Sequence, residues 1–357
     1  MSIPPIQANG YQIHLGDLGY LALNQLLANN GYTKIFILVD SHTNDNCAPR
    51  FLAELATEIP IELIEIEPGE AQKNIATCVE LWQILTELGA DKKSVLLGLG
   101  GGVISDLGGF VAATYKRGID FIAVPTTLLA MVDAAIGGKN GVDLGYLKNQ
   151  IGLIAIPKIV LVDVEFLGSL PQNEMRSGLA EMLKHGLIYD KAYWELFQDL
   201  SQLDSEYLEV LIVRSIEIKN NIVTQDPTEK GIRKALNFGH TLGHAIESYF
   251  LENPNKTSLL HGEAIAIGMQ LEAYLSLQKG LLEHNRYQEI KSTLRALYPT
   301  VSFDENDIDE IEKLLIHDKK NEGGKVLFVL LTEIGKITFN QTVEKEWIKA
   351  AFLDYKS

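Results

Sequence analysis

The first half of the chain alternates between short apolar runs and amphipathic stretches, and this alternation restricts the fold more than any other feature. The apolar runs are rich in β-branched residues and lie at 34–40, 61–66, 94–99, 121–124 and 159–163. Between two of them, the stretch 71–88 has apolar residues at helical spacing. Because short buried strands separated by helices form βαβ units, the pattern predicts a parallel sheet covered by helices.

The second half has a different pattern, since helical periodicity dominates from residue 171 onward. We expect helices at 173–188, 192–200, 206–226, 241–250, 262–278 and 285–297, and a strand pair at 325–331 and 335–338. A chain of 357 residues is long enough for two domains. The prediction is therefore an α/β N-terminal domain at 1–170 and a mostly α-helical C-terminal domain at 171–357.

Charge and composition exclude several classes of partner. With 31 basic and 47 acidic residues, the net charge of −16 disfavours nucleic acid and anionic membranes. No apolar run approaches the ~18 residues of a membrane span, and the first residues do not resemble a signal peptide. Cys47 and Cys78 are typical of free thiols in a reducing compartment. We therefore expect a cytoplasmic protein with neither a nucleic-acid nor a membrane partner.

A glycine-rich turn is the strongest local signal of the first half. The segment 98–106 (GLGGGVISD) follows a predicted strand and opens a helix, which is where backbone amides bind a pyrophosphate. Its spacing departs from the GxGxxG fingerprint, so a tight turn that binds nothing remains the alternative. Asp40 ends the first strand, where an acid can hold a ribose or simply cap a helix.

A second glycine-rich turn at 137–143 (GGKNGVD) carries Lys139. Lysine in such a turn is suited to a phosphate or carboxylate, although a solvated surface lysine is the usual alternative. Upstream, Thr126 and Thr127 end another strand, and Asp133 follows six residues later.

Histidines and glutamates of the second half predict a divalent-metal site. His240 and His244 are spaced i, i+4 and share one helical face, and His261 begins the next helix. The spacing alone does not choose the ligands, so the three histidines and Glu181, Glu247 and Glu263 all remain eligible. One of the paired histidines can instead transfer protons. Glu181 and Lys184, three residues apart, have apolar neighbours that allow a partly buried face, but by themselves they are more typical of a surface ion pair.

Basic residues gather near these motifs: Arg117, Lys139, Lys148, Lys184, Lys219, Arg233, Lys319 and Lys320. A nucleotide turn, a metal site and this positive charge together predict a phosphorylated, hydroxylated substrate. The nucleotide would exchange a hydride with it, and the metal would polarise an alcohol or carbonyl.

Blocks along nearly the whole chain resemble those of the 3-dehydroquinate synthases, which are sugar-phosphate cyclases. The blocks are GLGGGVISDLGGFVAATYKRGI (98–119), VPTTLLAMVDAAIGGKNGVD (124–143), RSGLAEMLKHGLI (176–188), GIRKALNFGHTLGHAIE (231–247) and LHGEAIAIGM (260–269). The resemblance implies a dehydroquinate synthase-like fold, with a Rossmann-like NAD-binding domain at 1–170 and a mainly helical metal- and substrate-binding domain at 171–357. It also implies a homodimer that uses NAD and Zn²⁺ or Co²⁺.

The implied reaction converts 3-deoxy-D-arabino-heptulosonate 7-phosphate into 3-dehydroquinate and phosphate, the second step of the shikimate pathway. Transient oxidation by NAD, β-elimination of phosphate, reduction and an intramolecular aldol follow one another, so the net reaction is that of a lyase. Another sugar-phosphate cyclase, a polyol or glycerol-phosphate dehydrogenase, and a non-catalytic nucleotide-binding paralogue are the alternatives. Arg233 and Asn237, together with Lys139, favour a substrate with a carboxylate.

The resemblance also implies site residues. The metal ligands would be Glu181, His240 and His261. Residues implied to bind NAD are Asp40, Glu70, Lys73, Gly101, Gly102, Asp106, Thr126, Thr127, Asp133, Lys139, Lys148, Phe166, Leu170 and Glu174. Catalytic and substrate residues would be Asp133, Lys139, Asn149, Lys184, Lys219, Arg233, Asn237, His244 and Lys319 (or Lys320), with Arg117 reaching the phosphate of the neighbouring subunit.

Overall fold

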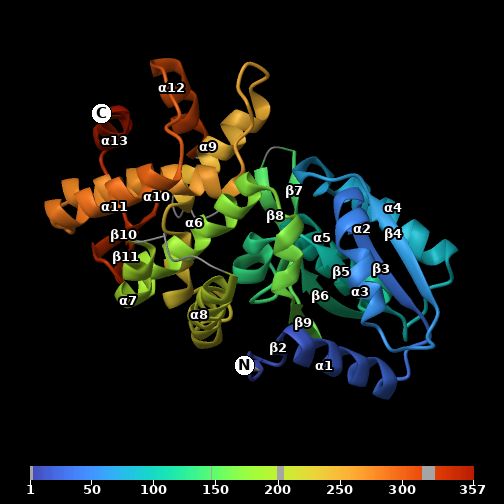
Figure 1. Ribbon diagram of the computed structural model, residues 1–357. Coiled ribbons are helices and arrows are strands. Elements are labelled where there is room, and N and C mark those ends of the chain that lie inside the picture. The colour runs from blue at the N-terminus through green and yellow to red at the C-terminus, as the bar shows by residue number, and fades with distance from the viewer. Residues whose placement is uncertain (1–2, 146, 199–204, 316–325) are drawn as a thin grey trace. The chain divides into compact units, whose positions relative to one another are not determined.

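The chain forms two compact units, Met1–Pro171 and Gln172–Ser357. The computed structural model describes residues 3–145, 147–198, 205–315 and 326–357 (Figure 1). The sequence placed the boundary between the two domains at 170/171, one residue before this division.

A sheet of mostly parallel strands forms the centre of the first unit. Among the described residues it has seven strands in the order β1-β2-β9-β6-β5-β3-β4, and every neighbouring pair except β1 and β2 is parallel. The strands are β1 (Ile6–Gln7), β2 (Gln12–Leu15), β3 (Ile35–Asp40), β4 (Ile61–Ile66), β5 (Val95–Gly100), β6 (Asp120–Pro125) and β9 (Ile159–Val162). All five apolar runs of the sequence are strands of this sheet, which confirms the predicted α/β class.

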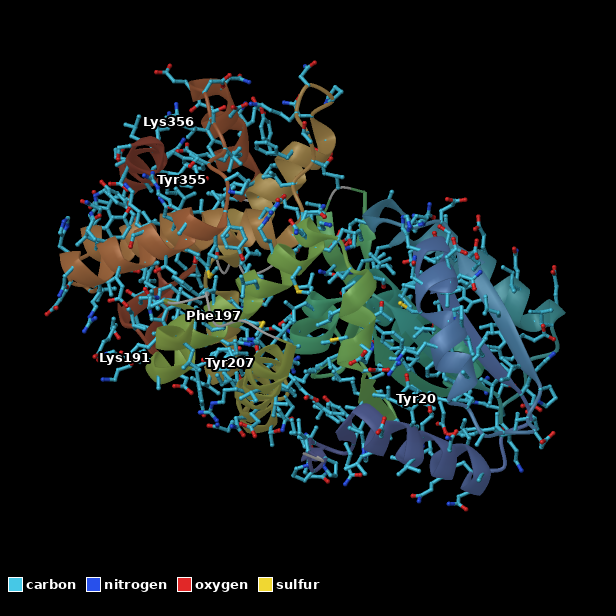
Figure 2. The ribbon with its side chains drawn as sticks, viewed as in Figure 1. Tyr20, Lys191, Phe197, Tyr207, Tyr355 and Lys356 are labelled. Carbon is cyan, nitrogen blue, oxygen red and sulfur yellow. The ribbon has the colours of Figure 1, made fainter. Side chains whose placement is uncertain are left out.

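Helices accompany these strands: α1 (Gly16–Asn29), α2 (Ser41–Asn46), α3 (Ala48–Ala53), α4 (Ile75–Glu87) and α5 (Gly102–Thr114). The helix expected at 71–88 begins later, because Asn74 caps it by accepting a hydrogen bond from the Thr77 amide at 3.0 Å. Tyr20 of α1, labelled in Figure 2, donates a hydrogen bond to Asp163 at the end of β9 (2.8 Å).

A hairpin of β7 (Lys139–Leu144) and β8 (Leu147–Ile154) lies between β6 and β9 in the chain, where the sequence analysis expected only a glycine-rich turn. The hairpin was not predicted because both of its strands contain glycine, which is uncommon in strands. A Cβ on Gly141 would lie 2.7 Å from the Ile151 carbonyl oxygen, and one on Gly152 would lie 2.7 Å from that of Asn140. The two strands therefore approach at glycines, which have low strand propensity.

One exposed turn in this unit has unusual backbone geometry. After α5, Lys116, Arg117 and Gly118 have φ values of 48°, 66° and 103°. A left-handed conformation costs on the order of 1–2 kcal/mol for a residue with a Cβ. Two long basic side chains are therefore held in a conformation that favours glycine.

The second unit is mainly helical, as predicted. Its helices are α6 (Gln172–Tyr189), α7 (Lys191–Glu195), α8 (Ser205–Gln225), α9 (His240–Glu252), α10 (His261–Gln278), α11 (His284–Leu297), α12 (Glu305–Leu314) and α13 (Lys345–Lys356), and β10 (Phe328–Glu333) pairs with β11 (Lys336–Gln341). Its core joins α9, α10, α12 and α13, and includes Leu271, Phe352 and Tyr355, the last labelled in Figure 2. Helices α12 and α13 were not among the elements predicted from the sequence.

Helices α9 and α10 cross at glycines. A Cβ on Gly268 would lie only 2.0 Å from the Gly239 carbonyl oxygen and 2.8 Å from the Gly243 amide nitrogen. The two backbones therefore touch at this crossing, and the side chains beside it are held at short range. In the described part of the chain, no helix is long and apolar enough to span a membrane.

Candidate functional site

The carboxyl ends of the parallel strands carry the candidate nucleotide-binding residues of the first unit. Strands β3, β5 and β6 end at Asp40, Gly100 and Pro125, and parallel strands end at the same edge of a sheet. As predicted, the glycine turn links β5 to α5. A Cβ on Gly100 would lie 2.5 Å from Ile104, so this position has no room for a side chain. Gly101 caps α5 without a side-chain hydrogen bond, which leaves the first-turn amides suited to a phosphate.

Asp40 has the structural role that the sequence analysis gave as the alternative. Its Oδ1 accepts the Thr43 amide at 2.8 Å, and the Thr43 hydroxyl accepts the Asp40 amide at 2.9 Å. The two residues form a capping box for α2. A role in holding a ribose stays a prediction.

A buried cluster of charges lies in this unit. Lys73 Nζ is 2.5 Å from Asp106 Oδ2, and Lys148 Nζ is 2.6 Å from Glu70 Oε1. Asp143 joins them: its Oδ2 is 3.7 Å from Lys148 Nζ, and its backbone amide donates to the Lys73 carbonyl at 2.8 Å. The structure thus brings together four predicted cofactor residues and one acid, Asp143, that the sequence analysis did not select. Asp143 is the last residue of the GGKNGVD block, and this position was the sequence signal that could have selected it.

The charges in this cluster determine its protonation. Burial by itself would lower the pKa of Lys73, but the carboxylates of Asp106, Glu70 and Asp143 outweigh burial and raise that pKa above its ordinary value. Burial raises the pKa of Asp106, and Lys73 opposes this rise. Lys73 is therefore a permanent cation that keeps its acidic neighbours bound around it.

The remaining predicted residues of this unit differ in exposure. Asp133 lies in a π-helical turn, Ala130–Ala134, and Thr127 Oγ1 accepts the first amide of that turn at 3.2 Å. Asn149 has a φ of 50° and donates its amide to Asp143 Oδ1 at 2.6 Å. Among the others, Thr126 and Phe166 are buried, Gly102 and Leu170 are half-buried, and Lys139 and Arg117 are exposed.

In the second unit, three helices bring the predicted metal ligands together. Glu181 of α6 is fully buried, and its Oε1 lies 3.5 Å from His240 Nε2 and 3.7 Å from His261 Nε2. The ligand nitrogens of His240, His244 and His261 lie within 4.8 Å of one another. Of the six residues that the sequence left as possible metal ligands, Glu181 and the three histidines therefore lie close together in the structure.

Glu181 also pairs through Oε2 with Lys184 Nζ. The two side chains are 0% and 1% exposed, so the expectation of a surface ion pair is wrong. The pair lies on the buried face of α6, where separating it would leave a charge in the interior. Lys184 is thus held beside the same carboxylate that faces the histidines.

The hydrogen bonds of the histidine rings suit a metal ion. His240 Nδ1 lies 3.1 Å from the Phe238 carbonyl oxygen, to which it donates, and His261 Nδ1 lies 3.1 Å from Glu247 Oε2. Each ring is therefore anchored at Nδ1 and turns Nε2 toward Glu181, as in metal sites whose ligands are oriented by second partners. Bonds of about 2.0–2.1 Å in a tetrahedron separate ligand atoms by about 3.3–3.4 Å. The observed 3.5 and 3.7 Å separations fit such an ion.

The cluster carries excess negative charge. Burial would lower the pKa of His261, but Glu247 and then Glu181 outweigh it and raise that pKa to about 10. Without a metal, His261 therefore holds a proton at neutral pH. A divalent cation that binds His261 must therefore replace that proton.

Besides Lys184 and His244, the predicted substrate residues described in this unit lie on α8 and on the segment that leads to α9. Lys219 and Arg233 are 6% and 2% exposed, so both cations are held inside the unit. Arg233 Nη1 donates to the Pro227 carbonyl at 2.8 Å, and Asn237 Nδ2 donates to Glu229 Oε1 at 2.7 Å. Glu174 is half-buried on α6, where burial, and then Glu263, raises its pKa. Lys319 and Lys320 lie outside the described residues.

An acid that the sequence analysis missed organises this segment. Asp226 accepts the backbone amides of Gly231, Lys230 and Arg233 at 2.7, 3.0 and 3.1 Å. These bonds fold the chain between α8 and Arg233. Glu229, also missed, has a φ of 58° inside the same loop. Neither acid belongs to a recognisable spacing pattern, so no sequence signal could have selected them.

Comparisons with known proteins agree with this geometry. A family model described as 3-dehydroquinate synthase N-terminal matches residues 63–177, and one described as 3-dehydroquinate synthase C-terminal matches residues 178–321. A 3-dehydroquinate synthase of Parabacteroides distasonis is 41% identical over 332 residues, which cover 91% of this chain and 92% of the relative.

Two solved structures extend the comparison. A 2-deoxy-scyllo-inosose synthase, complexed with carbaglucose-6-phosphate, NAD⁺ and Co²⁺, has a TM-score of 0.84 and 26% identity, covering 98% of this chain and 99% of the other. A 2-epi-5-epi-valiolone synthase from Streptomyces hygroscopicus, with NAD⁺ and Zn²⁺ bound, has a TM-score of 0.81 and 26% identity, covering 100% and 99%.

Proposed function

Because the chain belongs to the 3-dehydroquinate synthase family and shares its NAD- and metal-dependent lyase activity, we propose that the residues described above carry that reaction. The substrate is a phosphorylated sugar, and we assign it as 3-deoxy-D-arabino-heptulosonate 7-phosphate. The products are 3-dehydroquinate and phosphate. The observation that carries the metal-dependent reaction is the buried Glu181 carboxylate, with Oε1 3.5 and 3.7 Å from two imidazole nitrogens.

The metal ligands in this proposal are Glu181, His240 and His261, and the ion is Zn²⁺ or Co²⁺. The solved relatives that hold NAD⁺ with Co²⁺ or Zn²⁺ support this choice. Glutamate and histidine are typical ligands of catalytic zinc. When bound, the ion would polarise the substrate oxygen at the carbon being oxidised, while NAD⁺ would accept and return a hydride. His244, within the same cluster, is assigned to proton transfer.

In the first unit, the cofactor would be bound at the carboxyl edge of the sheet. The glycine turn before α5 offers backbone amides to the pyrophosphate, and Asp40 and the Lys73 cluster are assigned to the sugars. Glu70, Asp106 and Lys148 are the other assigned members of the Lys73 cluster. The remaining assigned contacts of this unit are Gly101, Gly102, Thr126, Thr127, Asp133, Lys139, Phe166 and Leu170, and Glu174 is assigned from the second unit.

The anionic groups of the substrate need fixed positive charge. Lys184 and Lys219 are assigned to the phosphate, and both are buried, so they bind without losing much side-chain freedom. Arg233 suits the carboxylate, because its guanidinium presents a planar pair of donors. Lys139, Asn149 and Asn237 complete this group of residues, with Lys319 assigned from sequence alone.

Two further assignments concern the protein in the cell. We propose a homodimer in which Arg117, exposed in its left-handed turn, reaches the phosphate bound by the other subunit. We also propose a cytoplasmic location, which the two free cysteines Cys47 and Cys78 support.

The deciding experiment incubates the metal-loaded protein with the heptulosonate phosphate and a catalytic amount of NAD⁺. We expect release of phosphate together with the cyclic product and no accumulation of NADH. No phosphate release, or stoichiometric NADH formation with a simple polyol, would reject the assignment. Glucose 6-phosphate in place of the heptulosonate separates it from related cyclases, since we expect no turnover without the carboxylate.

The metal assignment has its own test. His261→Ala should lose both bound metal and turnover, because it removes a ligand nitrogen. His284→Ala is the matched control, since His284 is an exposed histidine at the start of α11. A His261→Ala variant that keeps full metal content and turnover shows that the ligand set is wrong.

A further inference from the structure

We propose that Glu272 of α10 is a positioning residue for the metal centre: its carboxylate holds the first turn of α9, from which His240 faces Glu181. The inference rests on the proposed role of His240 as a ligand. It concerns the helix that carries the ligand, and it assigns Glu272 no contact with metal or substrate.

Helix α9 cannot cap itself with a side chain. Its N-cap residue is Gly239, which has a φ of 78°. A Cβ there would lie 2.5 Å from Met269 Cγ and 3.0 Å from the Met269 amide nitrogen, so both conformation and space require glycine. The Ser, Thr, Asp or Asn side chain that normally caps a helix is thereby excluded.

Glu272, which lies on α10, supplies this missing cap. Its Oε2 accepts the Gly239 amide at 2.7 Å, and its Oε1 accepts the Leu242 amide at 3.1 Å. These are the N-cap and N3 amides, the two groups that a capping box satisfies with two side chains. Here a single fully buried carboxylate binds both. The glycine crossing of α9 and α10, where Gly268 touches Gly239, brings the helices close enough for this contact.

The cap that Glu272 provides also holds the backbone around His240, the proposed metal ligand. His240 is the first residue after Gly239, so it lies between the two amides that Glu272 holds. Its ring is fixed by the Nδ1 bond to the Phe238 carbonyl (3.1 Å), with Nε2 3.5 Å from Glu181 Oε1. Backbone and ring are thus fixed independently. If the cap loosened, the ring bond alone would have to keep Nε2 in place.

The charge of the Glu272 carboxylate also affects the amino end of α9. The amino end of a helix carries about half a positive charge, which disfavours a cation held by the first helical residue. The Glu272 carboxylate, bonded to amides at that same end, offsets this charge. Metal affinity should therefore depend on the charge of Glu272 as well as on its shape.

Glu272→Gln tests both contributions, because glutamine keeps the size but loses the charge and one acceptor. Dissociation constants for Zn²⁺ and Co²⁺ are measured by competition with a chelator, together with the visible spectrum of bound Co²⁺. We expect affinity about 10–100-fold weaker, the range seen when partners outside the ligand shell are changed. The matched control is Glu312→Gln. It removes another buried carboxylate of this unit, which pairs with Lys345 at 3.1 Å, and should leave metal affinity unchanged.

The outcomes separate the inference from the proposed function. If the wild-type protein binds no metal, or binds it without His261, the ligand assignment fails. If wild type binds metal through His261 and Glu272→Gln binds it equally well, the inference is overturned and Glu272 is only structural. Should Glu272→Gln fail to fold, Glu272→Asp replaces it. Aspartate keeps the charge but is one methylene shorter, so we expect a loss of about tenfold, and wild-type affinity would again overturn the inference.

Discussion

Metal affinity of the histidine cluster should rise steeply with pH, because a proton and the ion compete for His261. Glu247 Oε2 lies 3.1 Å from His261 Nδ1, and Glu181 Oε1 lies 3.7 Å from its Nε2. Together they raise the pKa of His261 to about 10 against the effect of burial. An ion that binds Nε2 must therefore displace a proton at every pH below that value.

The expected size of the effect follows from this pKa. Below about pH 10, displacement of one proton lowers the apparent dissociation constant about tenfold for each unit of pH. Between pH 7 and pH 9 the change is therefore about 10², or 100-fold, and the curve should flatten near pH 10. One proton should be released for each ion bound at neutral pH.

The same pKa predicts how the stability of the metal-free protein depends on pH. Because folding raises the pKa of His261 from 6.5 to about 10, its stabilising contribution is fully present below pH 6.5. That contribution is lost as the pH rises toward 10. Urea unfolding of metal-free protein should therefore show a loss of stability between pH 7 and pH 9.5 that the metal-loaded protein lacks.

The assay titrates Co²⁺ against a chelator at pH 7, 8 and 9, and measures proton release with an indicator dye in weak buffer. Glu247→Gln is the diagnostic variant, since Glu247 is the strongest influence that raises the pKa of His261. Its curve should flatten at a lower pH. An affinity that is the same at pH 7 and pH 9, with no proton released, would refute the reasoning. An unchanged curve for Glu247→Gln would refute the assigned cause.

Further predictions concern packing, the loop and the charge cluster. Gly268→Ala should lower the free energy of unfolding in urea by about 2 kcal/mol or more, because its Cβ would lie 2.0 Å from the Gly239 carbonyl oxygen; an unchanged midpoint contradicts this. Asp226→Ala should raise KM about tenfold at unchanged metal content, since it frees the loop that holds Arg233; steady-state kinetics and metal analysis decide. Lys73→Met should destabilise by about 3 kcal/mol at neutral pH and by less in acid, where the carboxylates are protonated; equal losses at both pH values would contradict it.

The sequence predicted most of the elements whose pattern is local, although the amphipathic helices α12 and α13 were missed. Parallel strands such as β3 and β5 are buried on both faces, so they appear as continuous apolar runs. The histidine pair was visible because i, i+4 spacing puts both rings on one face of a helix. The β7–β8 hairpin was missed because its strands contain Gly141 and Gly152, and glycine is typical of turns.

Burial and long-range partners could not be predicted in the same way. Glu181 and Lys184 have the spacing of a solvated helical pair, and their apolar neighbours indicated partial burial at most, whereas the packing of α6 buries both side chains fully. Glu272 looks like one charge of an ordinary helix, and its bond to Gly239 joins residues 33 positions apart. Such roles arise from tertiary contacts, which cannot be predicted from the neighbouring residues in the sequence.

The left-handed turn at Lys116, Arg117 and Gly118 has a consequence for how this sequence can evolve. At φ values of 48° and 66°, glycine would be the more stable choice at either of the first two positions. A library of variants selected only for resistance to heat should therefore drift toward glycine there. Selection for turnover should instead retain arginine at 117 if its guanidinium is needed. Selection for stability and selection for activity therefore favour different residues in this turn. The difference between the residues that the two selections retain at position 117 would measure how much this exposed arginine contributes to turnover.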